Sequence, residues 1–169
     1  SVNKNTGAKA VLTADITVNT GDVAGCNGTK ATGWIDWTPI GNNDNQYTGT
    51  FDGQNHKISG LYFNHSGTNY VGLFGYVGSG GSVSNVGIVD SYFNGYRLVG
   101  GVCGRNYGTI TNCYNTGAVS GKSEYVGGVC GRNDGTIKSC YNTGTVTGKD
   151  YYVGGVCGLN KGGTITNCY

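Results

Sequence analysis

The sequence predicts an all-β fold, a right-handed parallel β-solenoid (β-helix) with coils of about 27 residues. Residues 99–125 are nearly copied as residues 126–152, and a third copy begins at Val153. Glycine supplies 34 of the 169 residues, which disfavours helices because each interior glycine costs about 0.8–1 kcal/mol relative to alanine. Apolar residues form short clusters rich in Val, Ile and Tyr between turn-forming residues, as in strands. A fixed period of this size indicates stacked repeats, none of which buries its apolar face alone.

Each repeat fits one coil with about three strands of roughly four to six residues and three turns, and adjacent coils should lie about 4.8 Å apart. Residues one period apart would then stack as ladders. We expect two inward aliphatic ladders and one asparagine ladder at a corner, formed by Val102/Val129/Val156, Ile110/Ile137/Ile165 and Asn106/Asn133/Asn160. The repeated glycines are expected at turns that require positive φ or leave no room for a Cβ atom, as at Gly108/Gly135 and Gly117/Gly144.

The chain is expected to form one continuous domain in two parts. Residues 1–69 should form irregular solenoid coils, and residues 70–169 the repeats, at about 70–98, 99–125, 126–152 and an incomplete 153–169. Within the first part, alternating residues at 10–18 predict a strand or two, residues 20–33 a loop, and residues 47–63 two strands around an Asp-Gly turn. Since the last repeat stops partway, we expect this chain to be part of something longer.

Four short segments carry a family resemblance. Gly-Leu-Phe-Gly at 72–75 and Gly-Val-Cys-Gly at 101–104, 128–131 and 155–158 resemble the GLUG motif (Gly, Leu, any hydrophobic residue, Gly) of bacterial surface repeat proteins, including some IgA-peptidase-type proteins. The segments at 37–41 and 47–53 resemble the region that commonly precedes those repeats, so the resemblance covers about residues 10–169. It implies an architecture and a surface location, but no particular chemistry, because the repeat accompanies many different surface proteins.

Composition argues against nucleic-acid and membrane-spanning functions. Only 12% of the residues are charged, and the net charge of +2 is spread over single lysines and arginines. Binding to phosphate backbones needs clustered basic side chains, so no nucleic-acid partner is expected. No apolar run approaches the roughly 18–20 residues that cross a bilayer, so no membrane insertion is expected within this segment.

Six of the seven cysteines fall into pairs within the repeats, and Cys26 is left over. The pairs are Cys103/Cys113, Cys130/Cys140 and Cys157/Cys168. The intervals do not match the Cys-x₂₋₄-Cys spacing of zinc sites, so no metal or other cofactor is expected. One hypothesis is a disulfide within each coil, which fits an extracellular compartment; a second is two ladders of small buried thiols; a third is bonding between ladder neighbours.

No catalytic constellation is visible, so the chain is not expected to be an enzyme. None of the nine acidic residues shares a repeated position with another, and Asp134 is replaced by Tyr107 and Lys161 in the neighbouring copies. His56 and His65 are isolated and are expected at turns or on the surface. Solenoid enzymes of the pectate-lyase type, by contrast, gather acidic and basic residues on one face.

Two outward patterns offer binding surfaces. Tyr114, Tyr141 and Tyr169 could present stacking faces to a glycan or an apolar patch to a protein, although a tyrosine ladder can also simply cover the solenoid flank. The Thr-Ile-Thr segments at 109–111 and 164–166 place hydroxyls as in ice-binding solenoids, with Lys138 interrupting the middle copy.

These observations predict a secreted or cell-surface solenoid that acts as a stalk, spacer or adhesive fibre segment of a bacterial surface protein, without catalysis. The alternative is an accessory or glycan- or substrate-recognising module of a larger surface enzyme such as a protease, and a minor alternative is ice binding. Expected partners are a second copy of the chain, end to end, or a surface protein or glycan. An uncovered terminal rung, with unpaired strand edges, motivates the self-association.

Overall fold

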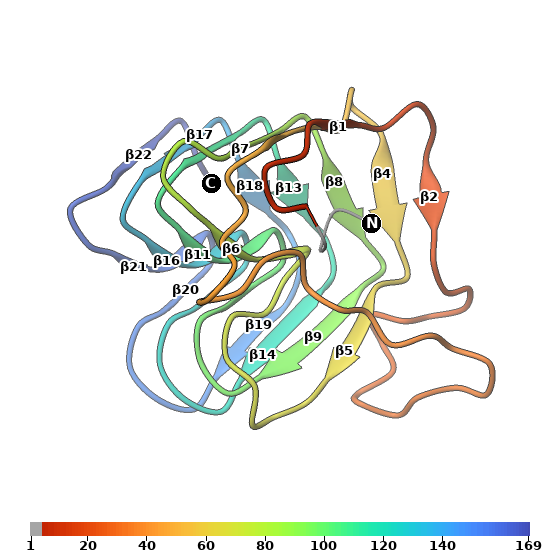
Figure 1. Cartoon of the computed structure of the whole chain (residues 1–169). Coiled ribbons are helices and arrows are strands. Elements are labelled where there is room, and N and C mark those ends of the chain that lie inside the picture. The colour runs from red at the N-terminus through yellow and green to blue at the C-terminus, as the bar shows by residue number, and fades with distance from the viewer. Residues whose placement is uncertain (1–4) are drawn as a thin grey trace.

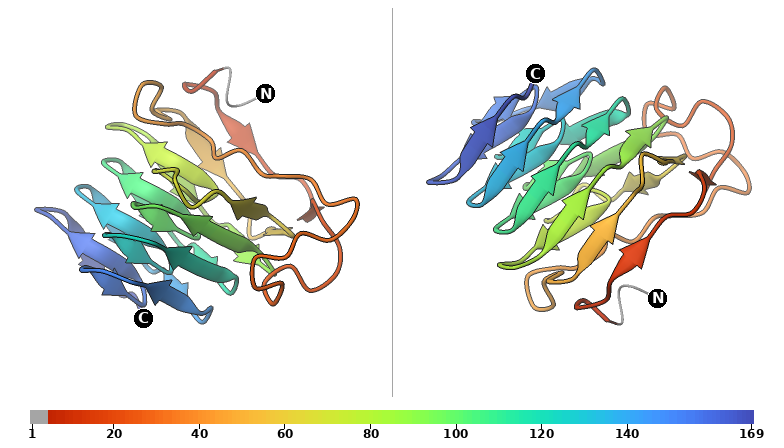
Figure 2. Two further views of the ribbon diagram at one scale, coloured as in Figure 1. Left: turned by 90° about the horizontal axis from the view of Figure 1, so that it is seen from below. Right: turned by 90° about the horizontal axis from the view of Figure 1, so that it is seen from above.

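The computed structural model describes residues 5–169 and confirms the parallel β-solenoid. Every strand pairing among these residues is parallel, and the described part of the chain contains no helix, and therefore none that could cross a membrane. Figures 1 and 2 show the coils stacked from the N-terminal end to the C-terminal end of the chain. Successive regular coils are offset by 27 residues, as between Asn106 and Asn133.

Five parallel sheets form the walls of the solenoid, and the chain visits them in turn. The first sheet contains β1 (Ala10–Val11), β3 (Thr50–Asp52), β7 (Ser82–Ser84), β12 (Thr109–Thr111), β17 (Thr136–Lys138) and β22 (Thr164–Thr166). The second contains β2 (Ile16–Thr17), β4 (Lys57–Ser59), β8 (Gly87–Val89), β13 (Tyr114–Asn115) and β18 (Tyr141–Asn142). The third contains β5 (Tyr62–Asn64), β9 (Tyr92–Gly95), β14 (Ala118–Gly121) and β19 (Val146–Gly148).

The two remaining sheets hold the Gly-Gly-containing part of each repeat. The fourth sheet contains β10 (Val99–Gly100), β15 (Val126–Gly127) and β20 (Val153–Gly154). The fifth contains β6 (Phe74–Val77), β11 (Cys103–Asn106), β16 (Cys130–Asn133) and β21 (Cys157–Asn160).

The regular coil therefore has five short strands, and the expectation of about three longer strands was wrong. The extra break falls between the fourth and fifth sheets. There the N–H groups of Val102 and Cys103 both donate to the carbonyl of Val129, which interrupts the regular ladder. Another break follows Asn106, where the chain turns into β12. Frequent corners shorten the strands because each corner takes residues out of the ladder.

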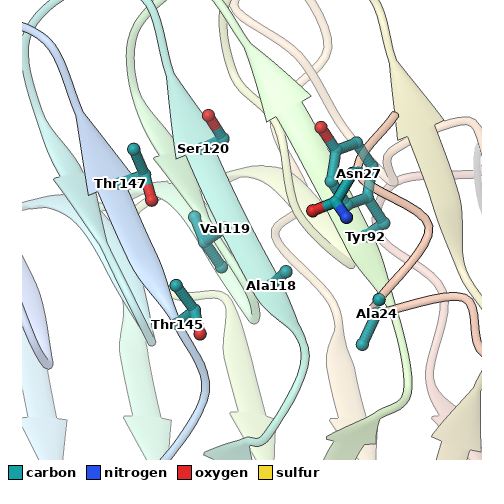
Figure 3. Close-up of a pocket in the computed structure, with 9 residues that line it drawn as sticks. Ala24, Asn27, Tyr92, Ala118, Val119, Ser120, Thr145 and Thr147 are labelled. Atoms are coloured by element: carbon teal, nitrogen blue, oxygen red, sulfur yellow. The ribbon is translucent and has the colours of Figure 1, made fainter. Parts of the chain in front are cut away.

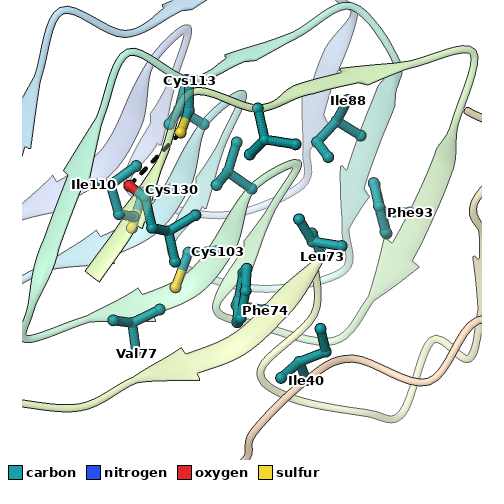
Figure 4. Close-up of a cluster of buried hydrophobic side chains, with 14 of the residues drawn as sticks. Ile40, Leu73, Phe74, Val77, Ile88, Phe93, Cys103, Ile110, Cys113 and Cys130 are labelled. Atoms are coloured by element: carbon teal, nitrogen blue, oxygen red, sulfur yellow. Dashed lines mark hydrogen bonds between the residues drawn. The ribbon is translucent and has the colours of Figure 1, made fainter. Parts of the chain in front are cut away.

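Inward ladders form the core, as the sequence predicted. Ile110 lies opposite Ile137 and Val83, Ile137 lies opposite Ile165, and the ladder continues through Phe51. Val102 and Val129 are fully buried and form the second ladder, with Val156 packed against the same core at its end. Figure 4 shows Leu73, Phe74, Phe93 and Ile110 extending inward from different walls.

Asparagine ladders fix two corners of every regular coil. The side-chain amide of Asn106 donates to Asn133 Oδ1 at 2.8 Å, and that of Asn133 donates to Asn160 Oδ1 at 2.8 Å, which confirms the predicted ladder. A second ladder, which sequence reasoning missed, joins Asn115 to Asn142 at 2.9 Å. In each, the asparagine oxygen accepts a bond from the N–H of the glycine two residues later, as at Gly108 and Gly117.

The predicted crowding at the corner glycines is confirmed, whereas positive φ is not found there. A Cβ atom on Gly108 would lie 2.2 Å from the carbonyl oxygen of Gly81, and one on Gly144 would lie 2.0 Å from that of Gly117. Positive φ occurs instead at non-glycine residues of two other corners. One corner precedes the fourth sheet, as at Tyr125 (φ 67°), and the other follows the first sheet, as at Ser139 (φ 53°).

The first coil is longer than the others and includes an irregular segment between β2 and β3. Single bridges join this segment to the next coil, at Asp36 with Tyr62, Ile40 with Phe74, and Tyr47 with Val77. The strands β3 and β4 flank the predicted Asp-Gly turn, but they belong to different sheets and do not pair with each other. The turn is therefore a corner of the coil and not a hairpin.

Candidate functional site

The three predicted tyrosines form one continuous outward stack on the second sheet. The rings of Tyr114 and Tyr141 are 4.9 Å apart and nearly parallel at 2°, and those of Tyr141 and Tyr169 are 5.3 Å apart at 7°. Gly87 occupies the preceding rung, where a Cβ atom would lie 2.2 Å from the ring of Tyr114. Burial, followed by the neighbouring tyrosines, raises the pKa of Tyr141. The tyrosine rings are thus stacked face to face, and Tyr169, which is 78% exposed, carries the most accessible ring.

The six repeat cysteines form two ladders of free thiols, and the hypothesis of a disulfide within each coil was wrong. Cys103 lies opposite Cys130, which lies opposite Cys157. All seven cysteines, which lie within the described residues, are unbonded. The two members of each expected pair come from different walls of the coil, as Figure 4 shows for Cys103 and Cys113.

The second thiol ladder consists of Cys113, Cys140 and Cys168. Sγ of Cys140 accepts the backbone N–H of Cys113 at 3.4 Å, and Sγ of Cys168 accepts that of Cys140 at 3.4 Å. Burial raises the pKa of the Cys113 and Cys130 thiols well above the ordinary value. Cys103 lies opposite Phe74 in the preceding coil, so these thiols occupy positions of apolar core side chains. Four ladder thiols, Cys103, Cys113, Cys130 and Cys140, are buried.

A charged cluster on the fifth sheet was missed in the sequence. Asp134 accepts two bonds from Arg132, at 2.9 and 2.8 Å, and one from Arg105 of the preceding coil at 3.4 Å. The guanidinium of Arg105 also lies 4.7 Å from the ring centre of Tyr107. All three charged side chains are at most 18% exposed. The sequence did contain a signal for this cluster. Arg105 and Arg132 occupy equivalent positions of successive repeats, and Asp134 follows Arg132 by two residues.

The histidines remain apart, as expected. Nδ1 of His56 lies 3.1 Å from Oδ1 of Asp15. The pKa of Asp15 is lowered, first by the bond it accepts from the Lys57 N–H and then by His56. His65 packs edge-on against Phe63 instead. Within residues 5–169, no three His, Cys, Asp or Glu side chains gather in a way that could hold a metal ion.

Outward hydroxyls on the first sheet form one complete row and one broken row. The complete row places Ser82, Thr109, Thr136 and Thr164 opposite one another, after Thr50 in the earlier coil. The second row contains Ser84, Thr111 and Thr166, but Asp52 and Lys138 interrupt it. A flat array with two uninterrupted rows, as the ice-binding alternative needs, is therefore not formed.

A groove on the third sheet is a further candidate that the sequence did not reveal. It has a volume of about 400 Å³ and runs between the loop at 24–27 and strand β19. Tyr92 and Asn27 lie at one end, and Thr145 and Thr147 at the other (Figure 3). The loop belongs to the irregular first coil, so sequence periodicity does not place it beside β14.

Comparisons with known proteins agree with this geometry. Residues 95–120 and 122–147 match the GLUG motif. A protein of Evansella cellulosilytica, provisionally named a Gly-rich membrane protein, is 39% identical over 79 residues, which are 45% of this chain and 9% of that protein. Halomucin of Haloquadratum walsbyi is 35% identical over 116 residues, which are 68% of this chain and 1% of halomucin. The chain therefore spans less than a tenth of the length of either relative.

A solved structure shows the same fold. It is a Bacteroides ovatus protein, provisionally described as an immunoglobulin A1 protease, and it superposes with a TM-score of 0.60. The superposition covers 96% of this chain and 69% of that chain, with 21% identical residues. Identity this low supports the fold alone and does not carry chemistry across. Sequence and fold together identify the chain as a β-solenoid that carries GLUG-motif repeats at 95–120 and 122–147.

Proposed function

We propose that this chain is a non-catalytic structural segment of a surface protein, in which the solenoid acts as a stalk or spacer. The observation that carries the proposal is the division between constant and variable positions of the repeat. Corner and core residues largely recur from coil to coil, whereas charged outward positions change, as from Arg132 to Leu159 in the fifth sheet and from Lys138 to Thr166 in the first. The outward tyrosines and threonines that do recur are uncharged. A rod requires only its interior to repeat, while catalysis requires charge fixed where charge develops in the transition state.

The proposed surface location rests on the relatives. One is named as a membrane protein and another as halomucin, and both are much longer than this chain. A short solenoid inside a long chain suits a spacer, because each coil adds about 4.8 Å of length without needing a partner of its own. The alternative, a recognition module of a larger surface enzyme, has in its favour the fold of the Bacteroides ovatus protein and a repeat motif that some IgA-peptidase-type proteins share.

Removal of one coil tests the spacer proposal. Deleting residues 126–152 joins Tyr125 to Val153, which reproduces the natural junction between Tyr152 and Val153. The shortened chain should fold, and small-angle scattering should show a rod shorter by about 4.8 Å. A chain that unfolds would show that the coils are not interchangeable. Turnover of immunoglobulin A1 or of a glycan by the purified segment would overturn the non-catalytic assignment.

We also propose end-to-end contact between copies through the last coil. Val153 is 43% exposed and Ile165 is half-buried, whereas their counterparts Val126 and Ile137 one coil earlier are fully buried. The strands of this coil leave one ladder edge unpaired, and a second solenoid could cover both edge and apolar rung. Sedimentation should show concentration-dependent association that Ile165→Lys weakens. A monomer at all concentrations would contradict this contact.

A further inference from the structure

The groove on the third sheet combines an aromatic face with a polar rim. It is lined by the loop residue Asn27 and by residues of β9, β14 and the β19 region, namely Tyr92, Ala118, Ser120, Thr145 and Thr147. Figure 3 shows Ala118 and Ser120 on the strand between Tyr92 and the two threonines, so they form the floor. Its volume of about 400 Å³ falls within the range of roughly 300–1,000 Å³ that small-molecule sites occupy.

The groove lies where an aromatic stack stops. The ring of Trp34 lies 5.5 Å from that of Tyr62, and the ring of Tyr62 lies 5.9 Å from that of Tyr92, with 20° between the last two planes. The register then places Ala118 opposite Tyr92 in the next coil. A methyl group thus stands at the position where the two preceding coils carry rings. The groove is the space of the missing ring, and a planar or chair-shaped ligand there would continue the stack.

Hydroxyl and amide groups border this space on the next row of the sheet. Ser120 lies opposite Thr147, and Asn27 faces the groove from the loop. Hydroxyls and amides both donate and accept hydrogen bonds, so they match the alternating donors and acceptors of sugar hydroxyls. An aromatic face receives the C–H face of a pyranose ring, while the rim contacts its hydroxyl edge. This pairing of a ring face with neutral polar groups points to a carbohydrate.

The wall formed by the loop is fixed before any ligand binds. The carbonyl of Gly28 accepts bonds from the Tyr62 hydroxyl at 2.9 Å and from the Asn64 amide at 3.0 Å. The N–H of Ala24 donates to Asp90 at 2.9 Å, and Val23 is fully buried. Since these bonds hold the loop against the sheet, binding costs little ordering of the protein.

We propose that this groove binds a neutral pyranose unit of a surface glycan. None of the residues that line it is charged, and two carboxylates, Asp90 and Asp22, accept bonds from the backbone N–H groups of the lining residues Ala24 and Gly25. Those carboxylates disfavour uronic acids and sulfated sugars by like-charge repulsion. The site is independent of the spacer proposal, since a rod can carry it or lack it.

Two opposite substitutions test the site. Isothermal calorimetry would measure binding of neutral hexasaccharides of glucose, N-acetylglucosamine, mannose and galactose, with hexagalacturonate as the acidic comparison. At least one neutral probe should bind, and Tyr92→Ala should weaken it at least tenfold. Ala118→Tyr should weaken it equally, because the new ring fills the groove. Tyr151→Ala should leave the affinity unchanged, because Tyr151 is 72% exposed and does not line the groove.

The Ala118→Tyr variant separates loss of binding from loss of fold. A tyrosine at position 118 would continue the stack of Tyr62 and Tyr92, so thermal unfolding should occur at or above the temperature of the unmodified chain. Lack of binding to every neutral probe would overturn the proposal, and so would tighter binding of hexagalacturonate. Undiminished binding by the folded Ala118→Tyr variant would also overturn it.

Discussion

Replacing Asn133 by alanine should destabilise the solenoid far more than the same change at Asn160. Asn133 is fully buried in the middle of its ladder, whereas Asn160 ends that ladder and is exposed. The Asn133 side chain donates to the carbonyls of Gly135 and Thr164 and to Asn160, and accepts bonds from the Gly135 N–H and from Asn106.

The magnitude follows from which groups lose their partners. Asn106 keeps its bonds to the carbonyls of Gly108 and Thr136, so its amide stays satisfied. The N–H of Gly135, by contrast, loses the side-chain oxygen that receives it. The Gly135 N–H is only partly buried, so leaving it unsatisfied should cost about 1–2 kcal/mol, and two lost ladder bonds add about 1 kcal/mol each. We therefore expect Asn133→Ala to lower the free energy of unfolding by about 3–4 kcal/mol.

Asn160→Ala is the matched control. Asn160 loses one bond to Asn133 and one to the Gly163 carbonyl, both at a surface where water can replace them. Its cost should stay below about 1 kcal/mol. Guanidinium unfolding followed by circular dichroism would compare both variants with the unmodified chain. Equal and small effects of the two substitutions would refute the idea that the asparagine ladder holds the coils together.

Three further predictions concern the core, one corner and the thiols. Ile137→Ala should lower the free energy of unfolding by about 2–5 kcal/mol, and Ile165→Ala should lower it clearly less, because Ile165 is only half-buried. Equal losses of unfolding free energy in chemical denaturation would contradict this. Ser139→Asn should raise the unfolding free energy by about 0.5 kcal/mol, because asparagine tolerates positive φ and Asn112 already occupies the equivalent corner of the preceding coil with positive φ. A decrease would show that another contact governs that corner. In the folded chain an alkylating reagent should modify Cys26 quickly and the four buried ladder thiols slowly. In denaturant without reductant, all seven cysteines should react. Fewer than seven alkylated cysteines in the mass spectrum would reveal disulfides.

The repeat and most of the interior can be predicted from the sequence alone. In a parallel stack, residues one period apart become neighbours, so a period of about 27 residues predicts contacts directly. The ladders headed by Val102, Ile110 and Asn106 follow from this rule, and the structure confirms them. The second asparagine ladder obeys the same rule, because Asn115 and Asn142 each precede a glycine by two residues, as Asn106 does.

How the parts of one coil meet could not be predicted from the sequence and is seen only in the folded chain. The period relates Cys103 to Cys130, but it does not say whether Cys103 also reaches Cys113, because that depends on the angle of each corner. Those angles arise from local φ values at residues such as Tyr125 and Ser139, which have no obligatory sequence signal. In the sequence, Asp134 was noted only for lacking an acidic counterpart in the neighbouring copies, whereas in the structure Asp134 binds arginines from two coils.

The groove beside Tyr92 shows this limit most clearly. Its floor belongs to the repeat, and one wall belongs to a loop more than sixty residues earlier in the chain, as the bond between Ala24 and Asp90 records. Periodicity determines contacts between equivalent residues of neighbouring coils, and the loop has no equivalent in any other coil. Its position is instead set by hydrogen bonds such as those to the Gly28 carbonyl, which depend on the completed wall of the solenoid.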